Sequence, residues 1–385
     1  MDKNAVIYQI LIDRFAGYDE TKDWLKPQFI GGNLKGIIDK LAYLKNLGVT
    51  TLWISPFYKT NAYHGYHITD FFEVDPHFGT KEDLKRLIQL VHDNNMSIIA
   101  DFVPNHLSRF HPYFKDAVSS KHSKYHDWFY FTKWPDEYLS FLSIKDIPKI
   151  NLTYDQARNH IIDAAKYWLS FGLDGFRLDH VIGPSNYFWK IFSKEIKTSY
   201  PRAVLIGEAW MQGISWHELK TIQIPLKKLK WLQKNHSDKT LRNYQNILDG
   251  VLDFTAQQLF HDFICLNKGS MNDLNKSLSK HFNSFKKDFL LPTFLDNHDM
   301  DRFLFRCNKD IGKLKQAARI QCSLTQPIII YYGTELGLSQ KHSMWTLKDH
   351  GDLFARKPMP WADINNENEL YYFYRNLFQK RMMNK

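Results

Sequence analysis

Short apolar stretches that alternate with amphipathic segments restrict the fold of this chain more than any other feature of its sequence. Strands that alternate with helices in this way form a parallel sheet. The segment ELYYFYRNLFQKR (369–381), for example, places its apolar residues on one helix face. The stretches that we expect to be strands are AVIYQILIDRF (5–15), TLWISPF (51–57), SIIADFV (97–103), GFRLD (175–179), AVLIGEAW (203–210), VLDF (251–254), a stretch that ends at Asp296, and PIIIYYGTE (327–335).

Eight strands and eight helices are accounted for by the end of this alternation, and 385 residues suffice for one large barrel. We therefore expect an α/β fold, the (β/α)8 TIM barrel. Residues 107–150 interrupt the alternation, and a connection of that length is usually functional or a small domain. We predict a small subdomain at 107–150, inserted after strand three, so that the barrel comprises 1–106 and 151–385. No C-terminal β-sandwich is expected, because only 24 residues follow Trp361 and a sandwich needs about 100.

The charge of the chain is positive but dispersed. The formal net charge is +10 and the pI is about 9.2. A basic balance can indicate a nucleic acid or an anionic membrane as partner. The lysines are spread along the chain and no nucleic-acid motif is present, so we expect neither partner. A basic stretch at 216–246 is interpreted as a solvated helical excursion, with a rim that shapes outer substrate subsites as the alternative.

The cysteines predict the cellular compartment. Cys265, Cys307 and Cys322 are an odd number and include no CxxC pair. This spacing predicts neither a disulfide framework nor a zinc site, and reduced thiols in a cytosolic protein are the expectation. No signal peptide precedes VIYQI and no apolar run approaches the length of a membrane span. We therefore expect a cytoplasmic location.

Two acidic residues at predicted strand ends have the surroundings that acid–base chemistry requires. Side chains in a strand alternate between faces, so Arg177 and Asp179 point to the same face. A guanidinium beside a carboxylate favours its charged form and lowers its pKa. Glu208 ends an apolar strand two residues before Trp210, and partial desolvation there raises a pKa. The alternative is that these groups are ion pairs or caps of purely structural importance.

Four acidic stretches, taken in order, resemble the α-amylase family of glycoside hydrolases. They are SIIADFVPNH (97–106), GFRLDHV (175–181), AVLIGEAW (203–210) and LLPTFLDNHD (290–299). The resemblance runs from residue 5 to about 361. It implies cleavage of α-glucans with retention of configuration, which requires two carboxyl groups in different electrostatic environments.

The resemblance also implies a role for particular residues. Asp179 matches the catalytic nucleophile, Glu208 the general acid and base, and Asp299 the third carboxylate, which grips sugar hydroxyls. Asp70 and Asp101 are expected to be structural. Tyr66 matches the aromatic residue that stacks on the sugar, although Tyr66 and Trp210 could instead be core residues. The complete set of expected substrate-binding residues is Tyr66, His106, Arg177, Trp210, His298 and Arg302.

A calcium ion is not expected. Many α-amylases hold one with an asparagine like Asn105 and an aspartate that in this chain is Lys149, in IPKIN (147–151). An ammonium group cannot ligate calcium, which takes oxygen donors, but it can occupy the place of the cation. We predict no metal and no cofactor.

IPKIN also resembles a motif of the neopullulanase and cyclomaltodextrinase branch. After the nucleophile, however, that branch usually has Asn-Glu and classical α-amylases have Lys-His, whereas this chain has HVIGPS (180–185). The resemblance implies an α-1,4-glucan hydrolase acting on maltooligosaccharides, cyclodextrins or starch-like glucans. The alternatives are a 4-α-glucanotransferase with the same catalytic residues and, less favoured, a non-catalytic glycan-binding relative. The oligomeric state stays open.

Overall fold

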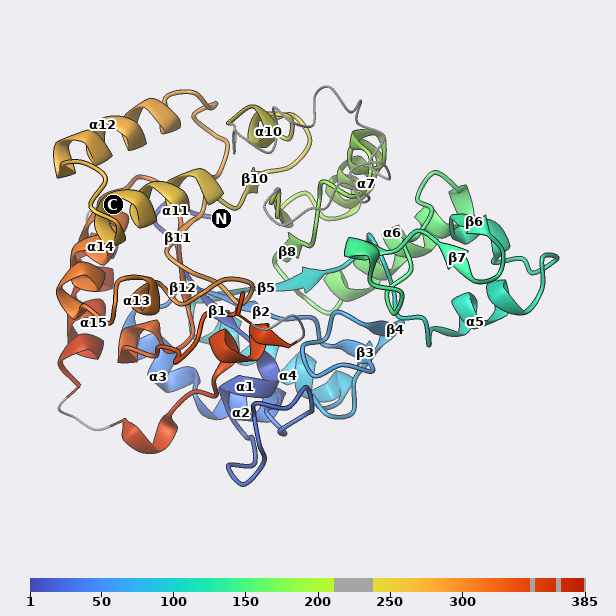
Figure 1. Cartoon of the computed structure of the whole chain (residues 1–385), viewed down its shortest axis with the longest axis horizontal. Coiled ribbons are helices and arrows are strands. Elements are labelled where there is room, and N and C mark those ends of the chain that lie inside the picture. Colours follow the sequence, from blue (N-terminus) through green and yellow to red (C-terminus); the bar gives the residue numbers. More distant parts are fainter. Residues whose placement is uncertain (211–237, 347–349, 365–367, 384–385) are drawn as a thin grey trace. The chain divides into compact units, whose positions relative to one another are not determined.

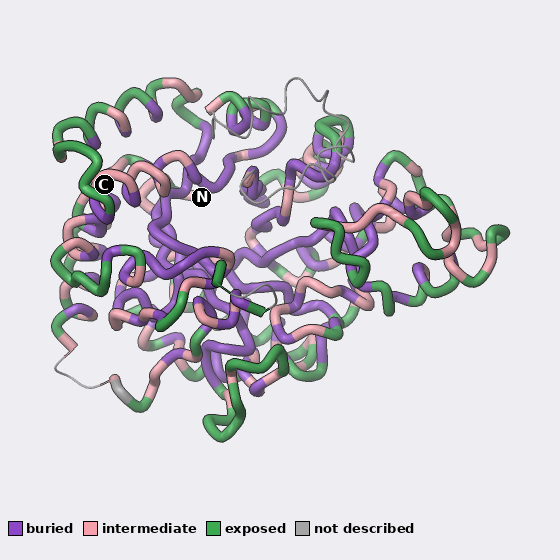
Figure 2. The backbone as a smooth tube through the Cα atoms, in the orientation of Figure 1, coloured by how far each residue is buried: buried purple, intermediate pink, exposed green. Residues whose placement is uncertain are grey.

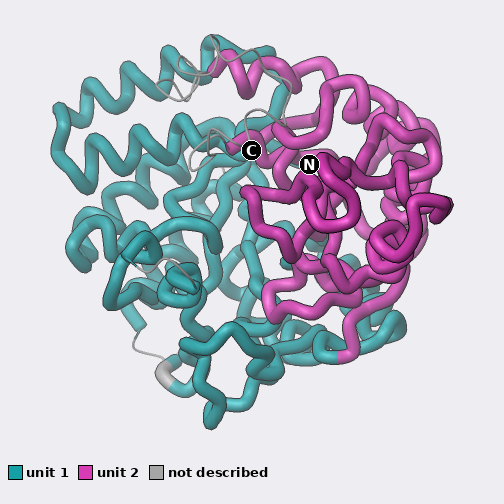
Figure 3. The backbone as a smooth tube through the Cα atoms, turned by 45° about the vertical axis from the view of Figure 1, so that its right-hand side comes forward, with its two compact units in different colours: residues 1–55, 77–99, 252–385 teal, residues 56–76, 100–251 magenta. Residues whose placement is uncertain are grey.

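The computed structural model describes residues 1–210, 238–346, 350–364 and 368–383. The chain divides into two compact units (Figure 3). Unit 1 comprises residues 1–55, 77–99 and 252–385, and unit 2 comprises residues 56–76 and 100–251. Most of the basic stretch 216–246 lies outside the described residues.

Eight strands of the described chain form one sheet in the order β10-β9-β8-β5-β2-β1-β12-β11 (Figure 1). Strands of this sheet that follow one another in the chain are neighbours, except β10 and β11, which are its two end strands. β1 pairs with β12, and the pairs of this sheet whose register is known are all parallel. This is the strand order of a (β/α)8 barrel, so the predicted fold class is confirmed. The strands are β1 Val6–Ile10, β2 Thr51–Ile54, β5 Ser97–Phe102, β8 Gly175–Leu178, β9 Val204–Gly207, β10 Gly250–Val251, β11 Thr293–Phe294 and β12 Ile328–Tyr331.

The helices of unit 1 come from the N-terminal and the C-terminal parts of the chain. α4 begins at a capping box, in which the Thr80 and Asp83 side chains bond to each other's backbone N–H groups. Helix pairs α2 and α4, α11 and α12, and α14 and α15 pack together. The principal helices are α2 Leu34–Asp39, α3 Leu41–Leu47, α4 Lys81–Asp93, α11 Phe254–Phe260, α12 Met271–Phe282, α13 Phe303–Arg306, α14 Ile311–Ser323 and α15 Glu369–Met383.

The first predicted strand is shorter than expected. β1 ends at Ile10, and Ile12–Phe15 forms the short helix α1. All residues of both elements are buried, so an uninterrupted apolar run could not separate strand from helix.

Unit 2 combines barrel elements with the long connection. The hairpin β3 Tyr58–Thr60 and β4 Ile68–Val74 precedes α5 Pro112–Ser119, β6 Phe131–Lys133, β7 Glu137–Tyr138 and the 3-10 turn η2 Phe141–Ser143. Helices α6 Asp155–Leu169 and α7 Asn186–Ser199 pack together, and the short helix α10 Asp238–Arg242 follows. Trp128 and Phe129 of this connection are buried, and Figure 2 shows exposed residues elsewhere in it. The boundaries of a subdomain at 107–150 stay a prediction.

The prediction of three reduced cysteines is wrong for two of them. Cys265 and Cys307 form a disulfide across 42 residues, and their Cα atoms are 4.6 Å apart. Cys265 ends a π-helical turn, His261–Cys265, and Cys307 is the C-cap of α13. Because tertiary packing brings these two turns together, the cysteine spacing in the sequence contains no signal of the bond. Cys322 is a free thiol.

The described helices include none that is both long and apolar enough to cross a membrane.

Candidate active site

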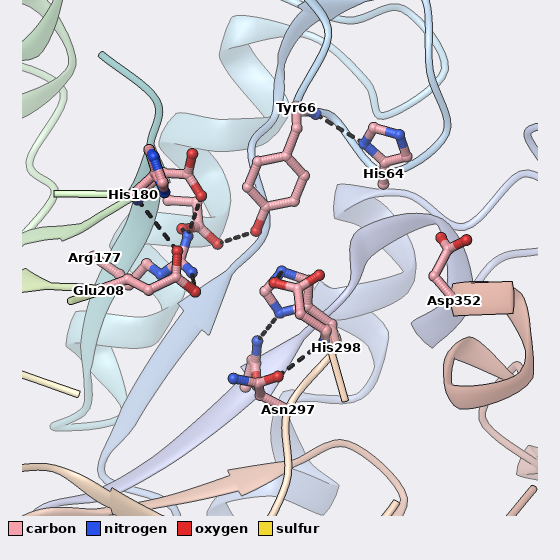
Figure 4. A network of polar contacts seen from close by, with 12 residues as sticks. His64, Tyr66, Arg177, His180, Glu208, Asn297, His298 and Asp352 are labelled. Carbon is pink, nitrogen blue, oxygen red and sulfur yellow. Dashed lines mark hydrogen bonds and ion pairs between the residues drawn. The ribbon is translucent and has the colours of Figure 1, made fainter. Parts of the chain in front are cut away.

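Arg177 is the centre of the acidic cluster in unit 2. It lies on β8, its side chain is fully buried, and one guanidinium nitrogen is 2.6 Å from Asp101 Oδ1 and 2.8 Å from Asp179 Oδ1. The other terminal nitrogen pairs with Glu208 Oε1 (Figure 4). Burial works to lower the pKa of Arg177, but the charges of Asp101 and Glu208 lead the effects that raise it well above its usual value. One permanently charged cation therefore holds three carboxyl groups together.

The backbone explains why Asp179 and Glu208 meet at this cation. In the parallel pairing of β8 with β9, Arg177 lies opposite Ile206 and Leu178 opposite Gly207. The Glu208 N–H donates to Leu178 O at 2.9 Å, and the Val181 N–H donates to Glu208 O at 3.0 Å. The two carboxyl groups thus follow the carboxyl ends of adjacent parallel strands. This is the edge at which barrel enzymes carry their chemistry.

Asp101, which the sequence analysis expected to be structural, is part of the same cluster. It lies in β5, in the part of that strand that belongs to unit 2, and it is fully buried. It accepts a hydrogen bond from the Tyr66 hydroxyl at 2.8 Å in addition to its contact with Arg177. Tyr66 is half-buried and its ring lies 5.7 Å from that of His64. The predicted stacking of Tyr66 on a sugar stays a prediction.

His180, which follows Asp179, has a strained backbone. Its φ of 44° is in the left-handed region, which side chains other than glycine rarely adopt. This conformation directs its N–H to Glu208 Oε2 at 3.2 Å. Burial comes first among the causes that lower its pKa well below the usual value, followed by the charge of Lys149. The imidazole is therefore neutral at neutral pH.

His106 lies beside this cluster with the predicted neutral character. It is buried and pairs with Lys149 in an isolated β-bridge. Burial, assisted by His67, lowers its pKa to about 3. Such a ring can hydrogen-bond to sugar hydroxyls without bringing a charge into the site.

The ammonium group of Lys149 contacts the turn that follows Asp179. Its Nζ donates to Gly183 O at 2.9 Å, and burial lowers its pKa to about 8. Asn105 Oδ1 is buried without a hydrogen-bond partner, but a lysine among the donors does not fit a calcium ion. Within the described residues, no group of three or more acidic, histidine or cysteine side chains could hold a metal. The expectation of no metal stays a prediction.

Asp299 is the centre of a second cluster, which lies in unit 1. Its Oδ2 is 2.9 Å from His298 Nε2, and its Oδ1 is 2.9 Å from a terminal nitrogen of Arg356. Gln9 Nε2 lies 2.6 Å from His298 Nδ1. Because an amide nitrogen only donates, Nδ1 is the acceptor and His298 presents Nε2–H to Asp299. His298 and Asn297 are drawn in Figure 4.

The arginine that contacts Asp299 is Arg356, which the sequence analysis did not single out. Arg302 is buried, and it donates to Ala355 O at 3.0 Å and to Tyr332 O at 2.7 Å, with its guanidinium over the Tyr331 ring. Arg356 was missed by the sequence reasoning. It donates to His298 O at 2.9 Å and pairs with Asp352 as well as Asp299. The spacing Asp352–Arg356, one helical turn, was the only signal that could have indicated it.

The last expected site residue, Trp210, is half-exposed at the edge of the described residues. The residues that the sequence singled out thus fall into two groups. Unit 2 brings together Arg177, Asp179, Glu208, Tyr66 and His106, and unit 1 brings together His298 and Asp299.

Comparison with known proteins places this chain in a family. The model of the alpha-amylase catalytic domain matches residues 9–138 and 132–380, which together span most of the chain. The chain belongs to the alpha-amylase family. The resemblance predicted from four acidic motifs is therefore confirmed.

The relatives include members of the branch that IPKIN indicated. Alpha-amylase 2 of Dictyoglomus thermophilum is 37% identical over 98% of this chain and 63% of its own length. A cyclomaltodextrinase from a Bacillus species is 31% identical over 98% of this chain and 66% of its own. A cyclic alpha-maltosyl-(1→6)-maltose hydrolase from Arthrobacter globiformis, solved in complex with maltose, is 25% identical with a TM-score of 0.83, over 98% of this chain and 83% of that one. The chain spans just under two thirds of the length of both curated relatives.

Proposed function

We propose that this chain is a retaining glycoside hydrolase that cleaves α-1,4-glucosidic bonds of maltooligosaccharides, cyclodextrins or starch-like glucans. The observation that supports this most directly is the guanidinium of Arg177, which contacts both Asp179 and Glu208 at the ends of adjacent strands. A retaining glycosidase needs one ionised carboxylate and one protonated carboxyl group near the same bond. The family membership supports the same substrate class.

Charge balance assigns the two roles. Three carboxyl groups share one guanidinium, and like charges at such short range resist simultaneous ionisation. Both Asp101 oxygens already have partners, the Tyr66 hydroxyl and Arg177. We therefore assign the proton that the reaction needs to Asp179 or Glu208. Family membership favours Glu208 as the acid and Asp179 as the nucleophile.

In the first step, an Asp179 oxygen attacks the anomeric carbon while the bond to the leaving oxygen breaks. Glu208 gives its proton to that oxygen, and a glycosyl ester of Asp179 forms. In the second step Glu208 takes a proton from water, the water oxygen attacks the anomeric carbon, and the ester bond breaks. Arg177 stays charged throughout and stabilises Asp179 whenever it is ionised.

Asp299 is proposed to bind sugar hydroxyls rather than to exchange protons. Contacts with His298 and Arg356 hold its oxygens, and 29% of its side chain is exposed. We propose Tyr66, His106, His298 and Trp210 as further substrate contacts. Arg302, buried against the Ala355 carbonyl, is proposed to act indirectly by positioning Arg356.

The broader assignments follow the family. We propose a barrel of residues 1–106 and 151–385 with a subdomain at 107–150, a cytoplasmic location, an α-glucan as partner, and no nucleic-acid or membrane partner. A 4-α-glucanotransferase, in which a sugar hydroxyl replaces water, is the second candidate. It is favoured by the half-exposed ring of Phe141, 4.6 Å from the His180 ring, because a sugar packs on an aromatic face.

The decisive test uses α-maltosyl fluoride, whose fluoride leaves without a proton. Glu208→Gln should lose about 10²–10⁴-fold in maltotriose cleavage but should still form the ester with maltosyl fluoride. Mass spectrometry of a protease digest should then find a maltosyl group on the peptide that contains Asp179. Glu195→Gln, at an exposed carboxylate of α7, is the matched control. Products of inverted configuration, or full activity of Glu208→Gln, would refute the proposal.

A further inference from the structure

The strained residue His180 lies between two anchored neighbours. Before it, the Asp179 N–H donates to Phe102 O at 2.9 Å. After it, the Val181 N–H donates to Glu208 O at 3.0 Å. His180 joins these two fixed points with a φ of 44°. A residue with a Cβ keeps this left-handed conformation only where the surrounding structure holds it, so the anchors are the place to look for what maintains the strain.

The Val181 carbonyl is held by two side chains from different parts of unit 2. Trp189 Nε1, on α7, donates to Val181 O at 2.7 Å, and the Tyr244 hydroxyl, between α10 and β10, donates to it at 3.0 Å. Trp189 and Tyr244 are both buried. Because one oxygen accepts both bonds, the direction of this carbonyl is fixed.

The Val181 side chain is held as tightly as its backbone. It is fully buried. A Cβ on Gly207, the last residue of β9, would lie 3.0 Å and 3.1 Å from the two Val181 methyl groups and 2.8 Å from Leu248 Cδ1. Glycine at position 207 therefore leaves the space that Val181 fills. Residue 181 is thus fixed through its N–H, its carbonyl oxygen and its side chain.

The purpose of this anchoring is visible at Glu208 (Figure 4). The left-handed backbone of His180 directs its N–H to Glu208 Oε2 at 3.2 Å. Relaxation of residue 180 to an ordinary φ would turn this N–H away. A hydrogen bond donated to a carboxyl group favours its ionised form. The bond therefore helps Glu208 to release its proton to the leaving oxygen.

We infer that Tyr244 is a positioning residue, which acts through the Val181 carbonyl to keep the His180 N–H on Glu208. This inference rests on the proposed function, because it gives Glu208 the role of the acid. The Tyr244 hydroxyl bonds to backbone, so its effect on the reaction passes through residues 180 and 181.

Several charged and titratable groups act on Glu208 or on His180, and removal of the Tyr244 hydroxyl alters none of these side chains. They are Arg177 of β8, Asp179 after that strand, Asp101 of β5, Tyr66, His106 and Lys149. A change in the proton release of Glu208 in a Tyr244 variant therefore reports the geometry of the turn.

The pH profile of kcat/KM for maltotriose tests this inference. Its alkaline limb reports the proton of the acid, Glu208. Tyr244→Phe keeps the ring and removes the hydroxyl, so the alkaline limb should move to higher pH by about 0.5 units, with Trp189 still holding the carbonyl. The position of a limb does not depend on the amount of folded enzyme. The kcat/KM for α-maltosyl fluoride, whose leaving group needs no proton, should stay within about twofold of wild type.

A glycine at position 180 gives the sharpest comparison. Glycine adopts positive φ without a Cβ penalty, so its backbone needs no anchor to stay there. Tyr244→Phe should therefore add no shift of the alkaline limb in a His180→Gly background. Tyr138→Phe is the matched control, because the Tyr138 hydroxyl also donates to a backbone carbonyl of unit 2, that of Lys145, at 2.8 Å. Its profile should coincide with that of wild type.

The outcomes separate the two proposals. An alkaline limb that stays in place in Tyr244→Phe, or that moves equally with and without glycine at position 180, would overturn the role of Tyr244. An equal shift in Tyr138→Phe would also overturn it. Wild-type enzyme that neither cleaves maltotriose nor releases fluoride would instead contradict the proposed hydrolase function.

Discussion

The acidic cluster of unit 2 and that of unit 1 hold their carboxylates in opposite ways. In unit 2 three carboxyl groups share the buried guanidinium of Arg177, and the Asp179 and Glu208 side chains are 9% and 7% exposed. In unit 1 one carboxylate, Asp299, is gripped from two sides by His298 and Arg356 and is 29% exposed. In the first arrangement several carboxyl groups compete for one cation, which suits bond cleavage. The second fixes the orientation of a single carboxyl group, which suits binding.

Removal of Arg177 should have the largest effect, because it removes the cation that the three carboxyl groups of unit 2 share. Arg177→Met leaves three buried carboxyl groups without their cation. We expect the activity to fall by about 10³-fold or more and the free energy of unfolding to fall by about 3–5 kcal/mol. Maltotriose kinetics and urea unfolding measure both. Arg202→Met, at an exposed arginine before β9, is the control. Retention of activity would show that the shared cation is dispensable.

A pair of substitutions should sharpen the distinction within unit 1. Arg356→Ala removes one charge-assisted contact to Asp299, so we expect kcat/KM to fall by about 10–100-fold with little loss of stability. Arg302→Ala removes the hydrogen bonds that Arg302 donates to the carbonyl oxygens of Ala355 and Tyr332. Its main expected effect is on the free energy of unfolding, by about 2–4 kcal/mol. The reverse pattern would mean that Arg302, and not Arg356, serves the substrate.

Acid should have a smaller effect, and His111 of unit 2 provides the test. Burial, and secondarily His160, lowers the pKa of His111 in unit 2 to about 3. The unfolded chain, with an ordinary histidine pKa of about 6.5, therefore binds a proton that the folded chain refuses. The stability from this residue is present in full above pH 6.5 and is lost as the pH falls toward 3. Between pH 7 and pH 5 the loss is about 2 kcal/mol.

His111→Asn removes this titration while it keeps a side chain able to cap α5. The variant should lose about 2 kcal/mol less than wild type between pH 7 and pH 5, as measured by urea unfolding. His122→Asn, at an exposed histidine of the same connection, should match wild type. Hydrogen exchange at pH 5 should show the amides around α5 opening first. An identical pH dependence in His111→Asn would show that His111 does not make the fold sensitive to acid.

The two clusters also differ in how far the sequence predicted them. The period of two in a strand correctly placed Arg177 and Asp179 on one face, and four motifs indicated the barrel and the family. The pairing of Glu208 with the same guanidinium depends on the register of β8 with β9, which no local pattern encodes. In unit 1 the motif FLDNHD indicated Asp299, but Arg356 reaches it from 57 residues away, while Arg302, much nearer in the chain, is buried elsewhere. The disulfide of Cys265 and Cys307 was missed for the same reason, since it too depends on tertiary packing.

The bond from Lys149 to the Gly183 carbonyl has a consequence for the conditions under which the site stays assembled. An ion recruited from solution occupies its place only to the extent that its concentration allows. A cation carried on a side chain has no such dependence, and neither dilution nor a chelator can strip it away. Its charge depends on pH instead. Burial lowers the pKa of the Lys149 ammonium group to about 8, so this group loses its charge in mildly alkaline solution.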